Sequence, residues 1–178
     1  NAYGRTEATE QLIPKFEEMG MSILGIWTED RMLLSLTVAQ VSEGLGGSFF
    51  SGSDFGNDLV VNFMVGGFGM DPGEYSFSTK GKKAVIVRGD RPDVQMSALG
   101  TDMECFILTN GLEPIEYVKY EADEEEVSIV IVDSDTIQTM ENIGSLQSNA
   151  LFDHVDKLES AKTMVSSCID VPNFLESL

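Results

Sequence analysis

The stretch that decides the fold is AVIVRGDRPDVQMSALGTDMECFILTNGLEPIEYVKYEADEEEVSIVIVDSDT, residues 84–136. It contains three apolar runs, residues 84–87, 104–108 and 127–132. A helical pattern of about ten residues follows each run, and this alternation is typical of βαβ units. Runs that are nearly continuous in apolar residues are typical of parallel strands buried on both faces. The stretch therefore predicts a three-layer α/β domain with a largely parallel sheet.

Each apolar run ends in a short polar segment that precedes a helix. In a parallel sheet these segments share one edge, at the carboxyl ends of the strands, where open α/β sheets bind ligands. Helix N-termini at that edge offer free N–H groups and a partial positive charge, which suit an anion. We therefore expect the ligand-binding residues to be Arg88, Gly89, Asp90, Arg91, Thr109, Asn110, Gly111, Asp133, Asp135 and Thr136.

The same residue types have a purely structural interpretation. Asp, Ser and Thr before a helix are ordinary N-caps. Pro92 and Pro114 suit the first turn of a helix, and Gly89 and Gly111 suit tight turns. Capping and ligand binding both remain open for these loops.

Basic residues gather in one part of an acidic chain. The net charge is −19, with 11 basic residues, which excludes binding to nucleic acid or to anionic membrane surfaces. Either a ligand anion meets the fork of Arg91, or the cations pair with acidic neighbours, including those of a partner subunit. Five of the basic residues form a local positive cluster, namely Lys80, Lys82, Lys83, Arg88 and Arg91.

Signatures of enzymes are few. There is no G-x-x-x-x-G-K-[ST] motif, so no P-loop nucleotide site is predicted, and the single His154 cannot make a usual zinc site. Asp90, Asp133 and Asp135 have side chains that bind Mg²⁺, although the sequence favours helix capping for them. We expect no catalytic residues, no metal and no cofactor.

The cysteines and the apolar runs bear on location. Cys105 and Cys168 lie in apolar contexts and cannot form a disulfide framework, which predicts a reducing, cytoplasmic environment. No apolar run approaches the roughly 18 residues that a membrane span requires.

The remaining elements are read from local patterns. Thr37 and Gln40 form a capping box that opens a helix, and this helix ends at Gly46-Gly47. The helix after Thr136 is expected to bury Ile137, Met140 and Ile143. We also expect a helix over 6–19 that is kinked at or begins at Pro14, strands over 21–27, 48–51 and 59–65, a loop over 66–83 with one helical turn near Glu74, and a last helix over about 153–168.

With Asp90-Arg91 followed by Thr109-Asn110-Gly111, the chain resembles a DRTGG domain, whose name comes from residues spread over two loops. The surrounding residues 85–93, 108–114 and 132–136 resemble the family too, and the likeness extends from about Leu33 to Ile143. Asn110 stands where the family has its first glycine. Asparagine tolerates a positive φ, so the turn is expected to survive.

The resemblance implies a regulatory and often dimeric domain without established chemistry of its own. DRTGG domains occur in phosphotransacetylases, between a dethiobiotin-synthetase-like P-loop domain and the catalytic domain, and beside CBS domains. Their fold is similar to the N-terminal domain of HPr kinase. The likeness divides the chain into a helix and strand resembling the end of a P-loop domain (1–33), the DRTGG-like domain (34–145) and a helical extension (146–178).

Three functions follow from these observations. The first is a non-catalytic regulatory and dimerisation module that senses an anionic metabolite or nucleotide for a neighbouring P-loop or catalytic domain. The second is a purely structural homodimer scaffold without a ligand. The third, which the sequence supports least, is an Mg²⁺-dependent phosphate hydrolase that uses Asp90, Asp133 and Asp135.

Overall fold

The computed structural model describes residues 6, 8–21, 23, 25–67 and 73–169. The chain divides into two compact units. Residues 34–151 form the first, which we call the α/β unit. Residues 1–33 and 152–178 form the second, which we call the terminal unit.

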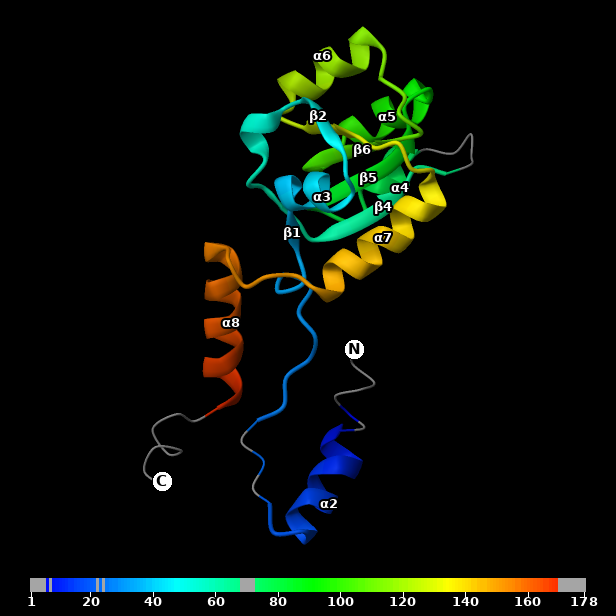
Figure 1. The fold of residues 1–178 in the computed structure, drawn as a ribbon. Coiled ribbons are helices and arrows are strands. Elements are labelled where there is room, and N and C mark those ends of the chain that lie inside the picture. Colours follow the sequence, from blue (N-terminus) through cyan, green and yellow to red (C-terminus); the bar gives the residue numbers. More distant parts are fainter. Residues whose placement is uncertain (1–5, 7, 22, 24, 68–72, 170–178) are drawn as a thin grey trace. The chain divides into compact units, whose positions relative to one another are not determined.

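The α/β unit is built on a five-stranded sheet in the order β2-β7-β6-β5-β4 (Figure 1). Neighbours from β4 to β7 run parallel, and β2 lies antiparallel at one edge. This arrangement confirms the predicted α/β fold with a largely parallel sheet. The strands are β2 (Ser48–Ser51), β4 (Asn62–Val65), β5 (Lys83–Arg88), β6 (Cys105–Thr109) and β7 (Ser128–Ile131).

Helices cover both faces of this sheet, which confirms the predicted three layers. Alternate residues of a strand point to opposite faces, so Val85 and Phe106 join one buried cluster whereas Ile86 and Ile107 join the other. The first cluster is closed by α4 (Gly73–Phe77), α5 (Pro92–Leu99) and α6 (Glu116–Glu124). The second is closed by α3 (Val38–Gly44), α7 (Thr136–Ser148) and the small antiparallel pair of β1 (Leu36–Thr37) and β3 (Leu59–Val60).

Local sequence signals set several helix ends. The Thr37 side chain accepts a hydrogen bond from the Gln40 N–H, and the Gln40 side chain accepts one from the Thr37 N–H. This confirms the predicted capping box at the start of α3. Asp135 caps α7 in the same way, because its Oδ1 accepts from the Gln138 N–H at 2.9 Å.

The rotation of α7 differs from the prediction. The apolar pattern places Ile137 and Met140 inward, but 71% and 48% of their surfaces are exposed. Ile143 is buried as predicted, and Thr139 is buried as well. The Thr139 hydroxyl donates to the Asp135 carbonyl at 2.7 Å, so this polar side chain is satisfied on the buried face of α7.

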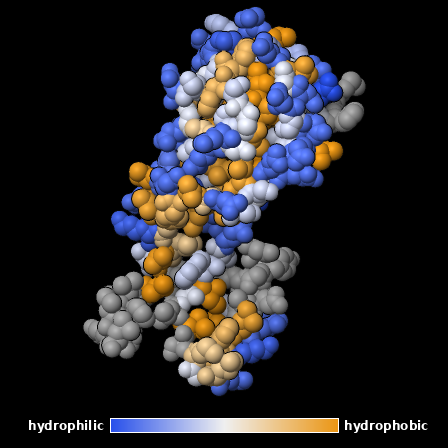
Figure 2. All heavy atoms as spheres, viewed as in Figure 1, coloured by the Kyte–Doolittle hydropathy of each residue, from blue (hydrophilic) through white to orange (hydrophobic). Residues whose placement is uncertain are grey.

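The described residues of the terminal unit include two helices, α2 (Ile13–Glu18), which follows the π-helical turn η1 (Ala8–Leu12), and α8 (Val155–Cys168). The described residues of segment 21–27 form no strand, so the prediction of a strand there is wrong. A strand needs a neighbouring backbone to pair with, and here Met21 and Trp27 are exposed. Apolar side chains lie at the surface of this unit in Figure 2, where they are orange.

Cys105 lies inside β6 and is fully buried, and this burial raises the pKa of its thiol above the ordinary range. A thiol that stays protonated is a poor nucleophile. The side chain of Cys168 lies outside the described residues. Within the described part of the chain, no helix is both long and apolar enough to cross a membrane.

Candidate functional site

Three loops meet at the carboxyl edge of the sheet, as the sequence predicts. Arg88 at the end of β5 pairs with Thr109 at the end of β6. The Thr109 and Thr136 hydroxyl oxygens are 3.4 Å apart, and the Asn110 N–H donates to the Ser134 carbonyl at 3.0 Å. We call this surface the carboxyl edge. Its role in ligand binding stays a prediction.

The loop after β6 is locked to the loop after β7 through its backbone. Asn110 and Gly111 have φ angles of 67° and 63°, the left-handed region that asparagine and glycine tolerate best. This turn directs the Gly111 N–H to the Val132 carbonyl at 2.9 Å. The expectation that asparagine preserves the turn at the family's glycine position is therefore confirmed.

Substitutions at Asn110 test this turn. We expect Asn110→Gly to change the free energy of unfolding by no more than about 0.5 kcal/mol, since glycine adopts this φ freely. Asn110→Val should destabilise by about 1–2 kcal/mol, because a β-branched residue is strained at positive φ. Urea unfolding measures both variants, and equal losses for the two would show that φ does not govern this position.

The loop after β5 packs tightly against the loop after β6. Gly89 is buried, and a Cβ atom placed on it would lie 2.0 Å from the Leu112 carbonyl oxygen. The sequence predicts a tight turn at this glycine, whereas the structure shows that the close approach of two backbones requires it. Gly89 thus joins the first loop to the second.

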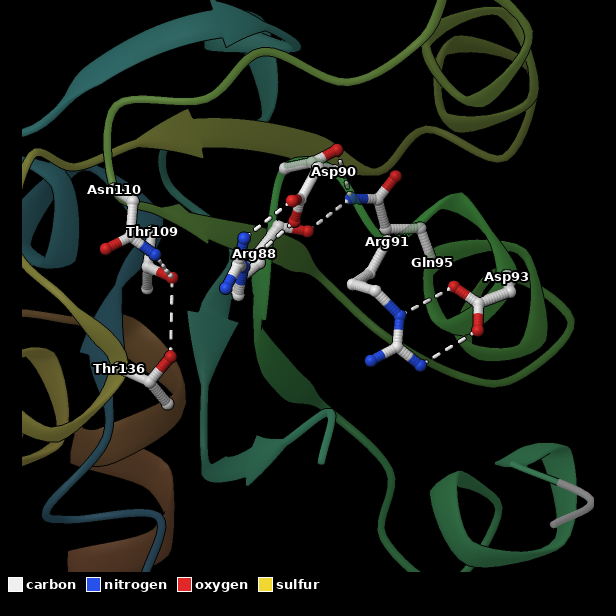
Figure 3. Close-up of polar contacts among 9 residues, drawn as sticks. Arg88, Asp90, Arg91, Asp93, Gln95, Thr109, Asn110 and Thr136 are labelled. Carbon is white, nitrogen blue, oxygen red and sulfur yellow. Dashed lines mark hydrogen bonds and ion pairs between the residues drawn. The ribbon is translucent and has the colours of Figure 1, made fainter. Parts of the chain in front are cut away.

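Gln95 is a residue of this site that sequence reasoning missed. It lies on α5, is fully buried, and its Nε2 donates to the Arg88 and Gly89 carbonyls at 2.8 Å and 3.0 Å (Figure 3). The sequence signal that could have identified it is a long polar side chain next to Val94, among the residues of α5 that are buried.

The two arginines of the carboxyl edge are paired with nearby aspartates. Arg88 forms a bidentate pair with Asp90 at 2.9 Å and 2.6 Å, and Arg91 forms one with Asp93 at 2.9 Å on both sides. In Figure 3 the guanidinium of Arg91 turns toward Asp93 on α5 and away from Thr109. The sequence left two interpretations of these arginines, binding of a ligand anion or pairing with acidic neighbours. In the structure both arginines pair with aspartates of the same chain.

These ion pairs change the charge states of the edge in a known direction. Hydrogen bonding to Arg91 lowers the pKa of Asp93 to about 2, and hydrogen bonding to Arg88 lowers the pKa of Asp90. Both carboxylates are therefore ionised at neutral pH. All four side chains are exposed or partly exposed, and exposed pairs contribute little because water and salt screen them.

The positive cluster expected from the sequence is divided between two edges of the sheet. Strand β5 runs from Lys83 to Arg88, a span of about 16 Å in extended backbone. Lys80, Lys82 and Lys83 therefore belong to the amino edge, and only Arg88 and Arg91 reach the carboxyl edge. Lys83 is buried, and its Nζ donates to the Asp102 carbonyl. The expectation of one positive region is wrong because proximity in sequence is lost along a strand.

Glu104 lies near these lysines at the amino edge. Partial burial raises the pKa of its carboxyl above the ordinary value of 4.5, and the charges of Asp58 and Asp102 raise it further. The folded protein therefore binds more protons than the unfolded chain just above that value, so the stability contributed here falls as pH rises.

Glu104→Gln removes the destabilisation that arises when this partly buried carboxyl is ionised. We expect the variant to unfold at a higher urea concentration than the wild type at pH 7, and the advantage to shrink as pH is lowered toward the ordinary pKa of the carboxyl. Glu113→Gln, at an exposed glutamate, is the matched control and should have little effect at either pH. An advantage that is equal at both pH values would contradict the assigned cause.

The acidic residues considered for metal binding have other contacts. Asp90 pairs with Arg88, and Asp135 caps α7. Among the described residues, no group of three or more His, Cys, Asp or Glu side chains is arranged to hold a metal ion. His154 accepts a hydrogen bond from the Asp156 N–H at the start of α8.

A largely parallel sheet covered by helices on both faces, with three interlocked loops at its carboxyl edge, defines an open α/β domain. Residues 40–146 match the DRTGG domain family. The match spans more than half of the chain, so the chain belongs to the DRTGG domain family, as the resemblance in its sequence implies.

The chain is also similar to a solved structure. This is the crystal structure of the CBS and DRTGG domains of the regulatory region of Clostridium perfringens pyrophosphatase, complexed with its activator diadenosine tetraphosphate. The TM-score is 0.53 at 12% identity, and the match covers 88% of this chain and 81% of that chain. At this identity the similarity concerns the fold.

Proposed function

We propose that this chain is a regulatory module that senses an anionic metabolite, in the first place a nucleotide, at the carboxyl edge. The observation that carries the proposal is the joining of three loops into one surface that presents the guanidinium groups of Arg88 and Arg91. Membership in a regulatory domain family supports it. So does the fold, which is similar to a regulatory region complexed with a nucleotide.

Binding would replace local ion pairs with ligand contacts. A phosphate group is the right shape for the bidentate fork of Arg88 or Arg91. The aspartates released from the arginines then face water, where an ionised carboxylate is well solvated. A ligand with several phosphate groups engages both forks at once, which favours a nucleotide di- or triphosphate over a single carboxylate such as pyruvate.

The loops also provide a route from the ligand to the rest of the molecule. They lead directly into α5 and α7, so an altered loop conformation acts on the helices of both faces. A ligand shifts a conformational equilibrium only through a difference in affinity for the two states. The regulated partner would be a neighbouring domain or a second copy of this chain.

Thermal unfolding against a panel of anions tests the proposal. The panel contains adenine nucleotides, nicotinamide cofactors, acetyl phosphate, coenzyme A and pyruvate. A ligand at 100 times its Kd should stabilise by about 2.7 kcal/mol, which for a chain of this size is roughly 5–10 °C in Tm.

We expect Arg91→Ala to reduce this shift by at least half. Lys119→Ala is the matched control, since Lys119 also forms an ion pair with a nearby aspartate, Asp123, but lies on α6. An unchanged shift in Arg91→Ala would contradict the assigned site, and no shift with any anion would contradict the proposed function.

A structural homodimer scaffold is the second candidate. It is favoured by the occupied forks of Arg88 and Arg91 and by the exposed Tyr117 and Tyr120 on α6, which are 58% and 59% accessible. A scaffold of this kind shows no ligand-dependent Tm, and its Tm rises with protein concentration.

A further inference from the structure

Gln95 is a long polar side chain near the carboxyl edge that is entirely buried, as the shorter side chains of Thr109 and Thr139 also are. It lies on the first turns of α5, with 0% of its surface exposed. It therefore cannot touch a ligand bound at the surface. Its influence on that surface must pass through the groups to which it is hydrogen bonded.

Those groups are two successive backbone carbonyls. The Gln95 Nε2 donates to Arg88 O at 2.8 Å and to Gly89 O at 3.0 Å, as the dashed lines in Figure 3 show. An amide nitrogen has two N–H groups, and both are used. The Oε1 atom has no hydrogen-bond partner among the described residues, and a buried unpaired acceptor is unfavourable. The favourable polar contribution of this side chain is therefore its pair of donated bonds.

The two carbonyls belong to the turn that carries both arginines. Arg88 O also accepts from the Arg91 N–H at 3.2 Å, and Arg91 O accepts from the N–H groups of Val94 and Gln95. Residues 88–91 thus form a turn that is closed by a backbone hydrogen bond, and the side chain of Gln95 binds two of its carbonyls. On the far side, Gly89 packs against the Leu112 backbone, so the turn is held between α5 and the next loop.

We propose that Gln95 is the positioning residue of the carboxyl edge. Its amide fixes the turn over residues 88–91 and so sets the directions in which Arg88 and Arg91 project. The part of this inference that concerns a ligand rests on the proposed function. The part that concerns the turn stands on the contacts of Gln95 alone.

Amide hydrogen exchange tests the inference in the full chain. In Gln95→Met, which keeps the volume but has no donors, we expect the Arg91 N–H to exchange about fivefold faster for each hydrogen bond lost. The N–H groups of Phe106 and Ile107 in the central strand serve as reference for global stability. Gln95→Asn, whose amide is too short to reach both carbonyls, should show the same selective effect and replaces Gln95→Met if that variant does not fold.

Ser128→Ala is the matched control. Ser128 is also fully buried, and its Oγ donates to the Gly52 carbonyl at 2.8 Å, near the opposite edge of the sheet. It should lower global stability without selectively accelerating exchange at Arg91. If exchange in Gln95→Met rises equally at Arg91 and in the central strand, Gln95 is an ordinary core residue and the inference is overturned.

A second readout separates this inference from the proposed function. With ATP as the probe, the Gln95→Met variant should bind several-fold more weakly than the wild type, whereas Ser128→Ala should bind equally well. If the wild type does not bind ATP or any other anion of the panel, the proposed function fails, and the exchange experiment still decides the role of Gln95. Unchanged ATP affinity together with faster exchange at Arg91 would overturn the positioning role.

Discussion

Replacing Gly89 with alanine is expected to destabilise the α/β unit by about 3 kcal/mol, near the upper end for overpacked sites. The added Cβ would lie 2.0 Å from Leu112 O and 2.5 Å from Leu112 C. These are backbone atoms of a neighbouring loop, so no side-chain rotation relieves the clash. The loops must separate, and the contact that joins the first loop of the carboxyl edge to the second is then lost. Urea unfolding followed by circular dichroism measures the loss.

The control for this variant is Gly100→Ala. Gly100 ends α5 with a φ of −68°, and a Cβ added there would meet no heavy atom within 4 Å beyond its own chain neighbours. We expect the effect of this substitution to stay within about 0.5 kcal/mol. If Gly89→Ala is tolerated as well as Gly100→Ala, the loops after β5 and β6 do not pack as described.

Replacing Phe106 with alanine should have a somewhat larger effect, a loss of about 4 kcal/mol. Phe106 is fully buried in β6, a strand with neighbours on both sides, and belongs to the core beneath α5 and α6. Its removal takes away the burial of a whole aromatic ring and leaves a cavity that the surrounding strands cannot close. Thermal and urea unfolding give the same ranking if the transition is two-state.

Tyr120→Ala provides the comparison for Phe106. This aromatic residue is 59% exposed on α6, so its truncation should cost no more than about 1 kcal/mol. A loss at Tyr120 as large as that at Phe106 would mean that the face of α6 is covered in solution, as the dimer scaffold requires. The pair of variants therefore also reports on the second candidate function.

The sheet could be predicted from the sequence because its signals are local and mutually consistent. The runs at 84–87, 104–108 and 127–132 are apolar apart from Glu104 and Ser128 at or near their starts, as is typical of strands buried on both faces. Because three strands separated by helices have to be parallel, their following loops were bound to share an edge. The gathering of Thr109, Asn110 and Thr136 at one edge follows from that topology.

Features that depend on tertiary contacts were less accessible. The basic cluster failed as a prediction because Lys83 and Arg88 are close in sequence but lie at opposite ends of β5. The rotation of α7 failed because apolar periodicity placed Ile137 and Met140 inward, whereas the buried face carries Thr139, whose hydroxyl is satisfied by the Asp135 carbonyl.

The candidate site could be predicted in its outline but not in its internal structure. The residues that give the DRTGG family its name lie, as expected, in loops that meet. The sequence left open whether Arg91 pairs with acidic neighbours, and the structure shows the pair with Asp93. The contacts of Gln95 with two carbonyls of the loop could not be inferred from the sequence. A polar residue among the apolar positions of a buried helix face is the sequence signal for a side chain that hydrogen bonds to a neighbouring loop.

Nucleotide sensing by the carboxyl edge is tested most directly by an NMR titration of the isotope-labelled full chain with ATP. We expect saturable shifts of backbone amides concentrated in residues 88–91, 109–111 and 133–136, with smaller changes along α5 and α7. Saturable shifts confined to the amino edge around residues 100–104, or to the terminal unit, would contradict the proposed site. Spectra that do not change at millimolar ATP would contradict nucleotide sensing by the carboxyl edge.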